Sequence, residues 1–215
     1  MLVKDIMQHD VACVRPETHL EEVVRLLQRR GVRHLPVLDH EDLVGIISDR
    51  DLKSVLPSPL TKLAATATPA DCDGLTAGDI MTKRVITVES IVSVEDAARM
   101  LMEERIGALP VMDGGVLVGI VTETDVLLLF VRAMGILEPS SRLDVLLPAE
   151  PASFGRMVHT IESAGVAVSS IVTLANPSLR LREAVVRVTT INPGPVIKAL
   201  ETEGYALRNP KRLTC

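Results

Sequence analysis

The stretch Gly45-Ile46-Ile47-Ser48-Asp49-Arg50-Asp51 occurs a second time as Gly119-Ile120-Val121-Thr122-Glu123-Thr124-Asp125. In both, an apolar segment runs into a hydroxyl residue, and a carboxylate follows three residues later. The apolar segment predicts a buried strand, and the hydroxyl with its acid predicts the start of a helix. The two stretches lie 74 positions apart, which indicates an internal duplication.

The same offset relates further segments on the N-terminal side of this stretch. The matching pairs are Asp5-Ile6-Met7 with Asp79-Ile80-Met81, Leu35-Pro36-Val37 with Leu109-Pro110-Val111, and Leu43-Val44 with Leu117-Val118. No gap is needed between residues 3 and 52, so the register is kept across separated blocks. We therefore predict two copies of one unit, residues 1–56 and 77–138, joined by a Pro- and Ala-rich linker at residues 57–76.

Each copy has the element order β-α-β-β-α. The predicted strands are Val11–Val14, Val32–Leu38 and Leu43–Ile47 in the first copy, and Val85–Val88, Ile106–Met112 and Val116–Val121 in the second. Between the first two strands, apolar residues at helical spacing, such as Leu20, Val23 and Leu27, place one face of a helix on the core. One unit is too small to bury its apolar faces, so the two should pack together.

The C-terminal part, residues 139–215, has a different pattern. The expected elements are strand Leu143–Leu147, helix Ser153–Gly165, strands Val166–Leu174 and Arg182–Ile191, helix Pro195–Glu203, and a last strand from Tyr205. This βαββαβ order is that of a split, ferredoxin-like sheet. The fold class of the chain is therefore α/β (α+β), with a tandem repeat followed by a third small domain.

Composition excludes several classes of protein. The chain has no Trp and three other aromatic residues, which argues against a base-stacking nucleic-acid surface. The net charge is −5, and the acidic excess lies in residues 1–138. No apolar run is long enough to span a bilayer, and the three cysteines have no metal-ligand spacing. We expect a cytoplasmic protein without nucleic-acid, membrane or metal sites.

The hydroxyl-x-x-Asp motif has two interpretations. As a capping box, the hydroxyl of Ser48 or Thr122 accepts from the backbone, and the acid three residues on reaches back. As a ligand site, the same hydroxyl and the free N–H groups of the helix start suit a phosphate. The carboxylate of Asp51 or Asp125 would then accept both hydroxyls of a ribose. The residues alone leave both interpretations open.

The blocks Asp-Ile-Met, Leu-Pro-Val and Leu-Val-Gly-Ile-hydroxyl-x-x-Asp, in this order and twice, resemble the CBS motif, which occurs in pairs called Bateman modules. The resemblance implies a compact pair with two clefts that bind AMP, ADP, ATP or S-adenosylmethionine. It implies that Ser48 and Thr122 contact phosphate and that Asp51 and Asp125 contact ribose. The adenine slots would be lined by segments that contain Val11, Val85, Pro36 and Pro110.

Basic residues suggest that the two clefts differ. The first copy has Arg33, His34 and Arg50 where the second has Gly107, Ala108 and Thr124, so we expect the first motif to favour the more highly phosphorylated ligand. Lys83 and Arg84 are further phosphate-facing candidates in the second copy. The alternative is that Arg33 and Arg50 are solvated surface residues.

Residues 139–215 resemble an ACT domain in their βαββαβ order and in the segment Leu146–Phe154. ACT domains carry Pro-Gly at the first strand-to-helix turn, whereas here Ala152 follows Pro151, which hinders the approach of an amino acid. The order CBS–CBS–ACT is similar to that of acetoin-utilisation (AcuB-type) proteins. An interface domain without ligand is an equal alternative.

Together these features predict a regulatory protein that binds an adenine nucleotide and requires no cofactor. No catalytic constellation is visible, so we expect no enzyme activity. The nucleotide would signal to a regulated protein or within an oligomer. The apolar run Val126–Phe130 predicts a packing surface between copies or protomers, and hence a homodimer. The alternatives are a structural dimerisation module with empty clefts, and an amino-acid-responsive regulator acting through the ACT-like domain.

Overall fold

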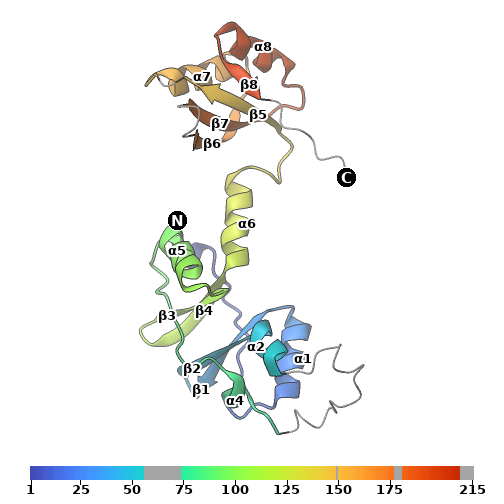
Figure 1. The fold of residues 1–215 in the computed structure, drawn as a ribbon, viewed down its shortest axis with the longest axis vertical. Coiled ribbons are helices and arrows are strands. Elements are labelled where there is room, and N and C mark those ends of the chain that lie inside the picture. The colour runs from blue at the N-terminus through green and yellow to red at the C-terminus, as the bar shows by residue number, and fades with distance from the viewer. Residues whose placement is uncertain (56–73, 149, 177–180, 209–215) are drawn as a thin grey trace. The chain divides into compact units, whose positions relative to one another are not determined.

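The computed structural model describes residues 1–55, 74–148, 150–176 and 181–208. The chain packs as two compact units, residues 1–127 and 128–215 (Figure 1). The linker expected at residues 57–76 lies outside the described residues, except for its last three positions.

The first unit contains both copies of the repeat. In the first copy the elements are the 3-10 turn η1 (Val3–Asp5), α1 (Leu20–Arg30), β1 (His34–Asp39), β2 (Asp42–Ser48) and α2 (Asp49–Val55). In the second copy they are α4 (Ala77–Ile80), α5 (Val94–Glu104), β3 (Ala108–Asp113), β4 (Val116–Thr122) and α6 (Glu123–Ala133), which runs on into the second unit. The predicted duplication is visible as two matching sets of elements.

The two hairpins have the same register. β1 pairs with β2 through His34 opposite Ser48, and β3 pairs with β4 through Ala108 opposite Thr122. Both carry an irregularity at the same place, between Val37 and Leu38 and between Val111 and Met112. The helices before them also end alike, since Gly31 and Arg105 both adopt the left-handed conformation of a C-terminal cap, with φ of 62° and 55°.

The expected first strand of each copy was wrong. Val14 makes one isolated parallel bridge to Val37, and Val88 makes the matching bridge to Val111. Neither segment extends further because the chain turns at once. The N–H of Thr18 donates to the carbonyl of Arg15 in the first copy, and that of Val92 donates to Glu89 in the second.

The two cores do not follow the two copies in sequence. The core built on α1, β1 and β2 includes Ala77 of the second copy, with Ile80 and Met81 packed against it. The core built on α5, β3 and β4 includes Val3 and Met7 of the first copy. Each copy thus completes its core with the N-terminal segment of the other.

A methionine and a glycine make this exchange possible. A Cβ on Gly45 would lie 2.4 Å from Sδ of Met81, and a Cβ on Gly119 would lie 2.7 Å from Sδ of Met7. The segments are also joined by backbone hydrogen bonds, which run in both directions between Ile46 and Thr82 and between Ile120 and Gln8. The Asp-Ile-Met and Val-Gly-Ile blocks of the repeat are therefore the two halves of one contact.

The second unit is a four-stranded antiparallel sheet with two helices. Its elements are β5 (Ser141–Leu147), α7 (Ser153–Ser163), β6 (Val168–Asn176), β7 (Leu181–Val188), α8 (Gly194–Thr202) and β8 (Ala206–Arg208). The strand order β6-β7-β5-β8 is that of the predicted split sheet. Alternate residues of β5 and β7, such as Leu143, Val145 and Val186, form one core with Met157 of α7 and Leu200 of α8.

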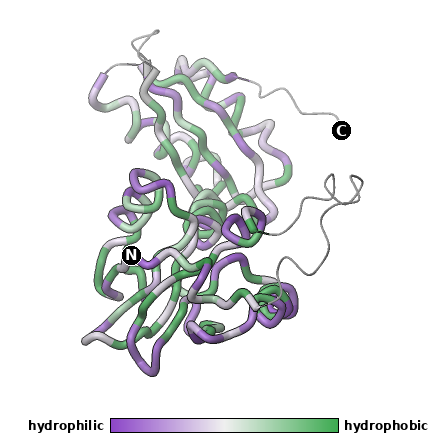
Figure 2. Tube along the Cα trace, turned by 60° about the horizontal axis from the view of Figure 1, so that its bottom comes forward, coloured by the Kyte–Doolittle hydropathy of each residue, from purple (hydrophilic) through white to green (hydrophobic). Residues whose placement is uncertain are grey.

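Hydrophobic and hydrophilic residues alternate along the trace of both units, as expected for elements with one buried face (Figure 2). None of the helices among the described residues is both long and apolar enough to cross a membrane.

Candidate functional site

A first cleft of about 290 Å³ lies between the copies. It is formed by the end of β2 and the start of α2 from the first copy, with the segments before α5 and before β3 from the second. Its lining includes Ile46, Ser48, Asp49, Arg50, Asp51, Thr82, Arg84, Val85, Ile86, Arg105, Ile106, Gly107, Ala108 and Glu123.

A second cleft of about 410 Å³ is made of the matching parts with the copies exchanged. It brings the end of β4 and the start of α6 together with the segments before α1 and before β1. Its lining includes Gln8, Asp10, Val11, Ala12, Arg30, Gly31, Val32, Ile120, Thr122, Thr124 and Asp125. Both volumes are near the lower end of the range for small-molecule sites.

The hydroxyl-x-x-Asp motif forms a closed capping box in both clefts. Oδ2 of Asp51 accepts from the backbone N–H and the hydroxyl of Ser48, each at 2.7 Å. Oδ2 of Asp125 accepts from the same two groups of Thr122 at 2.9 and 2.7 Å. The capping interpretation therefore describes the ligand-free geometry. The cap uses only Oδ2 of each aspartate, so Oδ1 can still accept a hydrogen bond from another group.

Two backbone N–H groups at each helix start already have partners. The N–H of Asp49 donates to the carbonyl of Arg33 at 3.0 Å, and that of Glu123 donates to Gly107 at 3.2 Å. The N–H of Asp51 donates to the hydroxyl of Ser48. In this geometry these N–H groups are not free to donate to a phosphate, so charged side chains that line each cleft are further candidates for phosphate binding.

The first cleft is rich in unpaired guanidinium groups. The side chains of Arg50, Arg84 and Arg105 make no hydrogen bond or ion pair with any residue that the structure describes. Oδ1 of Asp51 likewise accepts no hydrogen bond within the described parts of the chain. One carboxylate oxygen and three cations are thus available to a ligand.

The charged groups of the second cleft are engaged with each other. Arg30 makes two hydrogen bonds to the carboxylate of Asp10, at 2.9 and 3.2 Å. Oδ1 of Asp125 accepts from Nε2 of Gln8 at 3.1 Å. In the same cleft, Nη2 of Arg33 donates to the hydroxyl of Thr124 at 2.9 Å.

His34 and Arg33 line both clefts and form the wall between them. A Cβ on Gly107 would lie 2.9 Å from Cε1 and Nε2 of His34, so the imidazole rests on the glycine backbone. Burial, and then the neighbouring Arg33, lower the pKa of His34 below its ordinary value, against the opposing carboxylates of Asp49, Glu123 and Asp51. The imidazole is therefore neutral at pH 7.

The structure divides the predicted site residues into groups. Ser48, Asp51, Arg50, Arg84 and Val85 line the first cleft, and Thr122, Asp125 and Val11 line the second. Lys83, Pro36 and Pro110 line neither of them, because Lys83 is exposed outside the walls and the prolines are buried in β1 and β3.

Arg33 and His34, which we expected to favour phosphate in the first site, line the first cleft and also the second. Arg33 directly precedes β1 and His34 is the first residue of this strand, at the place where the two clefts adjoin. Sequence reasoning also missed Arg105, Gln8 and Asp10. Asp10 and Gln8 could have been found by applying the repeat offset to Arg84 and Thr82.

No group of three or more metal-ligating side chains occurs among the residues that the structure describes.

The CBS domain family model matches residues 3–58 and 77–132, which together make up just over half of the chain. The CBS-pair protein CBSX2 of Arabidopsis thaliana, solved in complex with AMP, is 34% identical with a TM-score of 0.51, over 61% of this chain and 96% of that one. The CBS domain pair of protein MJ0100, solved with 5′-methylthioadenosine and S-adenosyl-L-methionine, is 31% identical with a TM-score of 0.51, over 60% of this chain and 95% of that one.

A putative acetoin utilization protein (AcuB) from Vibrio cholerae has a TM-score of 0.53 over 66% of this chain and 98% of its own length. At 24% identity this likeness concerns the fold alone.

Proposed function

This chain belongs to the CBS domain family, and we propose that it is a non-catalytic regulatory protein that binds an adenine nucleotide in its first cleft. The observation that carries the proposal is the free Oδ1 of Asp51 beside the three unpaired arginines Arg50, Arg84 and Arg105. The AMP complex of CBSX2 and the adenosine compounds bound by MJ0100 support a ligand of this class.

The cleft offers a partner to each part of a nucleotide. Val85, Ile86 and Ile106 provide an apolar slot for the adenine ring. Asp51 accepts the ribose hydroxyls, since a carboxylate has acceptor capacity beyond the bonds of its cap. The arginines then form charge-assisted hydrogen bonds with the phosphate, which are stronger than neutral ones.

Calorimetric titration of the full chain with AMP, and of two matched variants, tests this function. Asp51→Ala removes the ribose acceptor, so the affinity for AMP should fall by about tenfold or more. Asp96→Ala is the control, because Asp96 exchanges the same two hydrogen bonds with the hydroxyl of Ser93 at the start of α5 as Asp51 does with that of Ser48, and lines neither cleft.

Loss of a cap lowers the free energy of unfolding by about 1 kcal/mol in either variant. A binding defect confined to Asp51→Ala would therefore come from the ligand. Absence of heat with AMP, ADP, ATP and adenosine on the folded wild type would overturn the proposed function.

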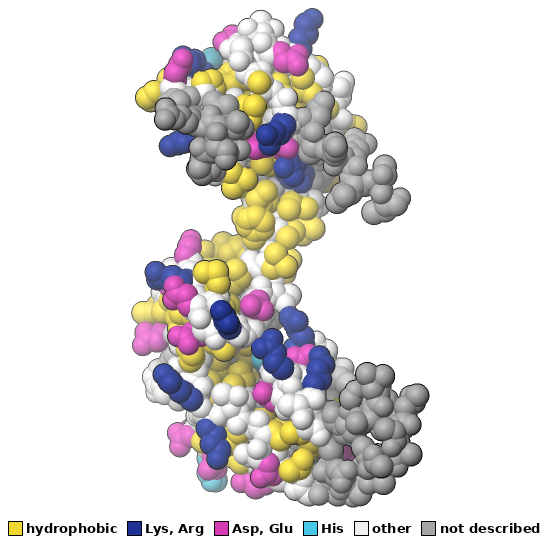
Figure 3. Space-filling view, in the orientation of Figure 1, with side chains coloured by type: hydrophobic (Ala, Val, Ile, Leu, Met, Phe, Trp, Pro, Cys, Tyr) yellow, Lys and Arg dark blue, Asp and Glu magenta, His cyan; other side chains and the backbone are white. Residues whose placement is uncertain are grey.

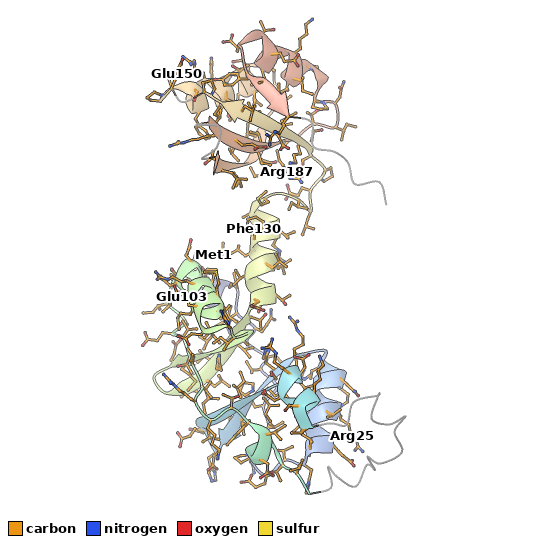
Figure 4. The ribbon with its side chains drawn as sticks, in the orientation of Figure 1. Met1, Arg25, Glu103, Phe130, Glu150 and Arg187 are labelled. Atoms are coloured by element: carbon orange, nitrogen blue, oxygen red, sulfur yellow. The ribbon has the colours of Figure 1, made fainter. Side chains whose placement is uncertain are left out.

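We also propose a homodimer, formed through α6. Leu127, Leu128 and Phe130 on this helix are 60%, 41% and 53% exposed, whereas Val126 packs against the core of the second copy. Figure 3 shows hydrophobic side chains gathered along α6, and Figure 4 marks Phe130 among them. Neighbouring apolar side chains exposed on one helix are typical of an interaction surface.

Sedimentation at micromolar concentration should give twice the mass of 23.2 kDa. Phe130→Lys should shift the chain to monomer, while Ile91→Lys, at a site 65% exposed outside this helix, should not. A monomeric wild type would contradict the dimer.

We propose CBS units at residues 1–56 and 77–138, followed by an ACT-like domain at residues 139–215, which the split-sheet order of the second unit supports. Its first strand-to-helix turn is closed by its own hydrogen bonds. The hydroxyl of Ser153 donates to the carbonyls of Pro148 and Glu150, and the hydroxyl of Tyr205 donates to the carbonyl of Ser153. A turn filled in this way favours an interface domain over an amino-acid site.

A further inference from the structure

Positions 84 and 10 hold opposite charges at the same place in the two clefts. Arg84 directly precedes Val85 on the wall of the first cleft, and Asp10 directly precedes Val11 on the wall of the second. The backbone at both places is fixed alike by the matching antiparallel bridges of Thr82 and Gln8. A phosphate beside this wall would therefore meet a cation in the first cleft and an anion in the second.

The residue two positions after the hydroxyl strengthens the contrast. In the first cleft it is Arg50, whose side chain makes no ion pair or hydrogen bond with the described residues. In the second cleft it is Thr124, an uncharged residue that accepts from Arg33. The second cleft has two cations, Arg30 and Arg33, and both are engaged: the guanidinium of Arg30 is bound by the carboxylate of Asp10, and that of Arg33, which also borders the first cleft, donates to Thr124.

The second cleft nevertheless keeps what an uncharged nucleoside needs. Val11, Ala12 and Val32 line its walls, and its volume of about 410 Å³ is not smaller than that of the first cleft. Asp125 can accept a ribose hydroxyl if the amide of Gln8 gives up its hydrogen bond. This replaces one hydrogen bond by another and leaves no buried group unpaired.

We propose that the residues at positions 84 and 10 determine the class of ligand in each cleft: the first cleft takes a phosphate-bearing adenine nucleotide, and the second takes an adenine nucleoside without phosphate. This inference rests on the proposed function. The physical basis is that Arg84 attracts a phosphate, whereas Asp10 repels it and also holds Arg30.

Calorimetry of the full chain with ATP, and with adenosine on protein already saturated with ATP, tests the inference. Wild type should bind one ATP per chain and then one adenosine. Arg84→Asp should weaken ATP binding by about tenfold or more, because an attraction becomes a repulsion. Lys83→Asp makes the same change of charge one residue away, outside both clefts, and should alter the affinity for ATP by less than about threefold.

Asp10→Arg is the converse variant. It supplies a cation to the second cleft and releases Arg30, so the stoichiometry for ATP should rise from one to two per chain, and adenosine should be displaced. The side chain of Asp10 is 81% exposed, so the substitution leaves the core intact. Asp10→Asn, which only removes the charge, should give an intermediate result.

Two equal ATP sites in the wild type, or equal effects of Arg84→Asp and Lys83→Asp, would overturn the inference and leave nucleotide binding standing. An ATP-saturated wild type that takes up no adenosine would overturn the assignment of the second cleft. If neither adenosine nor any adenine nucleotide bound at all, the proposed function itself would fail.

Discussion

The two clefts have the same backbone and different side chains. Both combine the end of a hairpin strand from one copy with a wall from the other, and both are capped by a hydroxyl and an aspartate in the same geometry. The first cleft leaves Arg50, Arg84 and Arg105 unpaired within the described chain, whereas the second binds Arg30 to Asp10. The two copies have thus kept the same hairpin, wall and cap, and they differ in the charged side chains that line each cleft.

The largest expected effect is on stability, and it concerns the contact between a glycine and a methionine that occurs once in each copy. Gly45→Ala places a Cβ within 2.4 Å of Sδ of Met81, and Gly119→Ala places one within 2.7 Å of Sδ of Met7. Each should lower the free energy of unfolding by about 1–3 kcal/mol through overpacking. Urea unfolding measures this, with Gly155→Ala as the control, since its Cβ meets no atom within 4 Å.

If Gly45→Ala were stable and Gly119→Ala were destabilised, the two glycine–methionine contacts would not be equivalent.

The two aspartates should differ in their effect on binding. Asp51→Ala removes a carboxylate with one free oxygen, whereas Asp125→Ala removes one whose second oxygen is already bound by Gln8. The affinity for AMP should therefore fall at least about tenfold more in the first variant, or about 1.4 kcal/mol. Calorimetry with AMP checks this, and equal losses would show that both clefts hold the nucleotide.

Gln8→Ala should have a smaller effect, on the affinity of the second cleft for adenosine. It releases Oδ1 of Asp125, so that a ribose hydroxyl no longer competes with the amide. We expect the affinity of the second cleft for adenosine to rise by about 2- to 10-fold, the value of one net hydrogen bond. The matching variant in the first cleft, Thr82→Ala, should not raise the affinity for AMP, because Oδ1 of Asp51 accepts no hydrogen bond from the described residues, and a rise there would contradict the assignment.

The smallest effect is a pH dependence that only the first copy contributes. His34 has no titratable counterpart, since Ala108 stands at the matching position. Because its pKa is lowered in the fold, the unfolded chain binds the proton more readily. The stability that His34 contributes is therefore complete above its unfolded pKa of about 6.5 and is lost as the pH falls below that value.

Unfolding measured between about pH 5 and 8 should show this slope for the wild type and a flatter one for His34→Gln. His40→Gln is the control, because the side chain of His40 is 94% exposed. An unchanged slope in His34→Gln would assign the pH dependence to other groups.

Much of the fold could be predicted because the duplication kept the sequence blocks in register. The hairpins, the helices α1 and α5, and the split sheet of the second unit follow from apolar periodicity and turn residues. The strands expected at Val11–Val14 and Val85–Val88 were wrong, since apolar residues predict a strand but do not reveal the turn at Arg15 that ends its pairing.

The aspartates and hydroxyls of the candidate site lie in the clefts as the motif indicated, and their contact with a ligand stays a prediction. Arg50 and Arg84 line the first cleft, but the position of Arg33 beside both clefts could not be predicted, because sequence order does not show which copy supplies each wall. Arg33 lies on the first copy but bonds to Thr124 of the second. Contacts across a duplicated pair depend on tertiary packing, which a linear pattern does not contain.

The exchange of the two Asp-Ile-Met segments between the copies bears on the ancestry of the repeat. A single copy on its own would leave the space beside its glycine empty, and its Asp-Ile-Met segment could fill only the matching space of a second molecule. Two such chains would therefore exchange these segments in a symmetric dimer. Fusing both copies into one polypeptide makes the swap intramolecular, at an effective concentration in the millimolar range. In a dimer of identical chains every substitution appears twice. The two clefts of this chain can carry different residues because the two copies are separate stretches of one sequence.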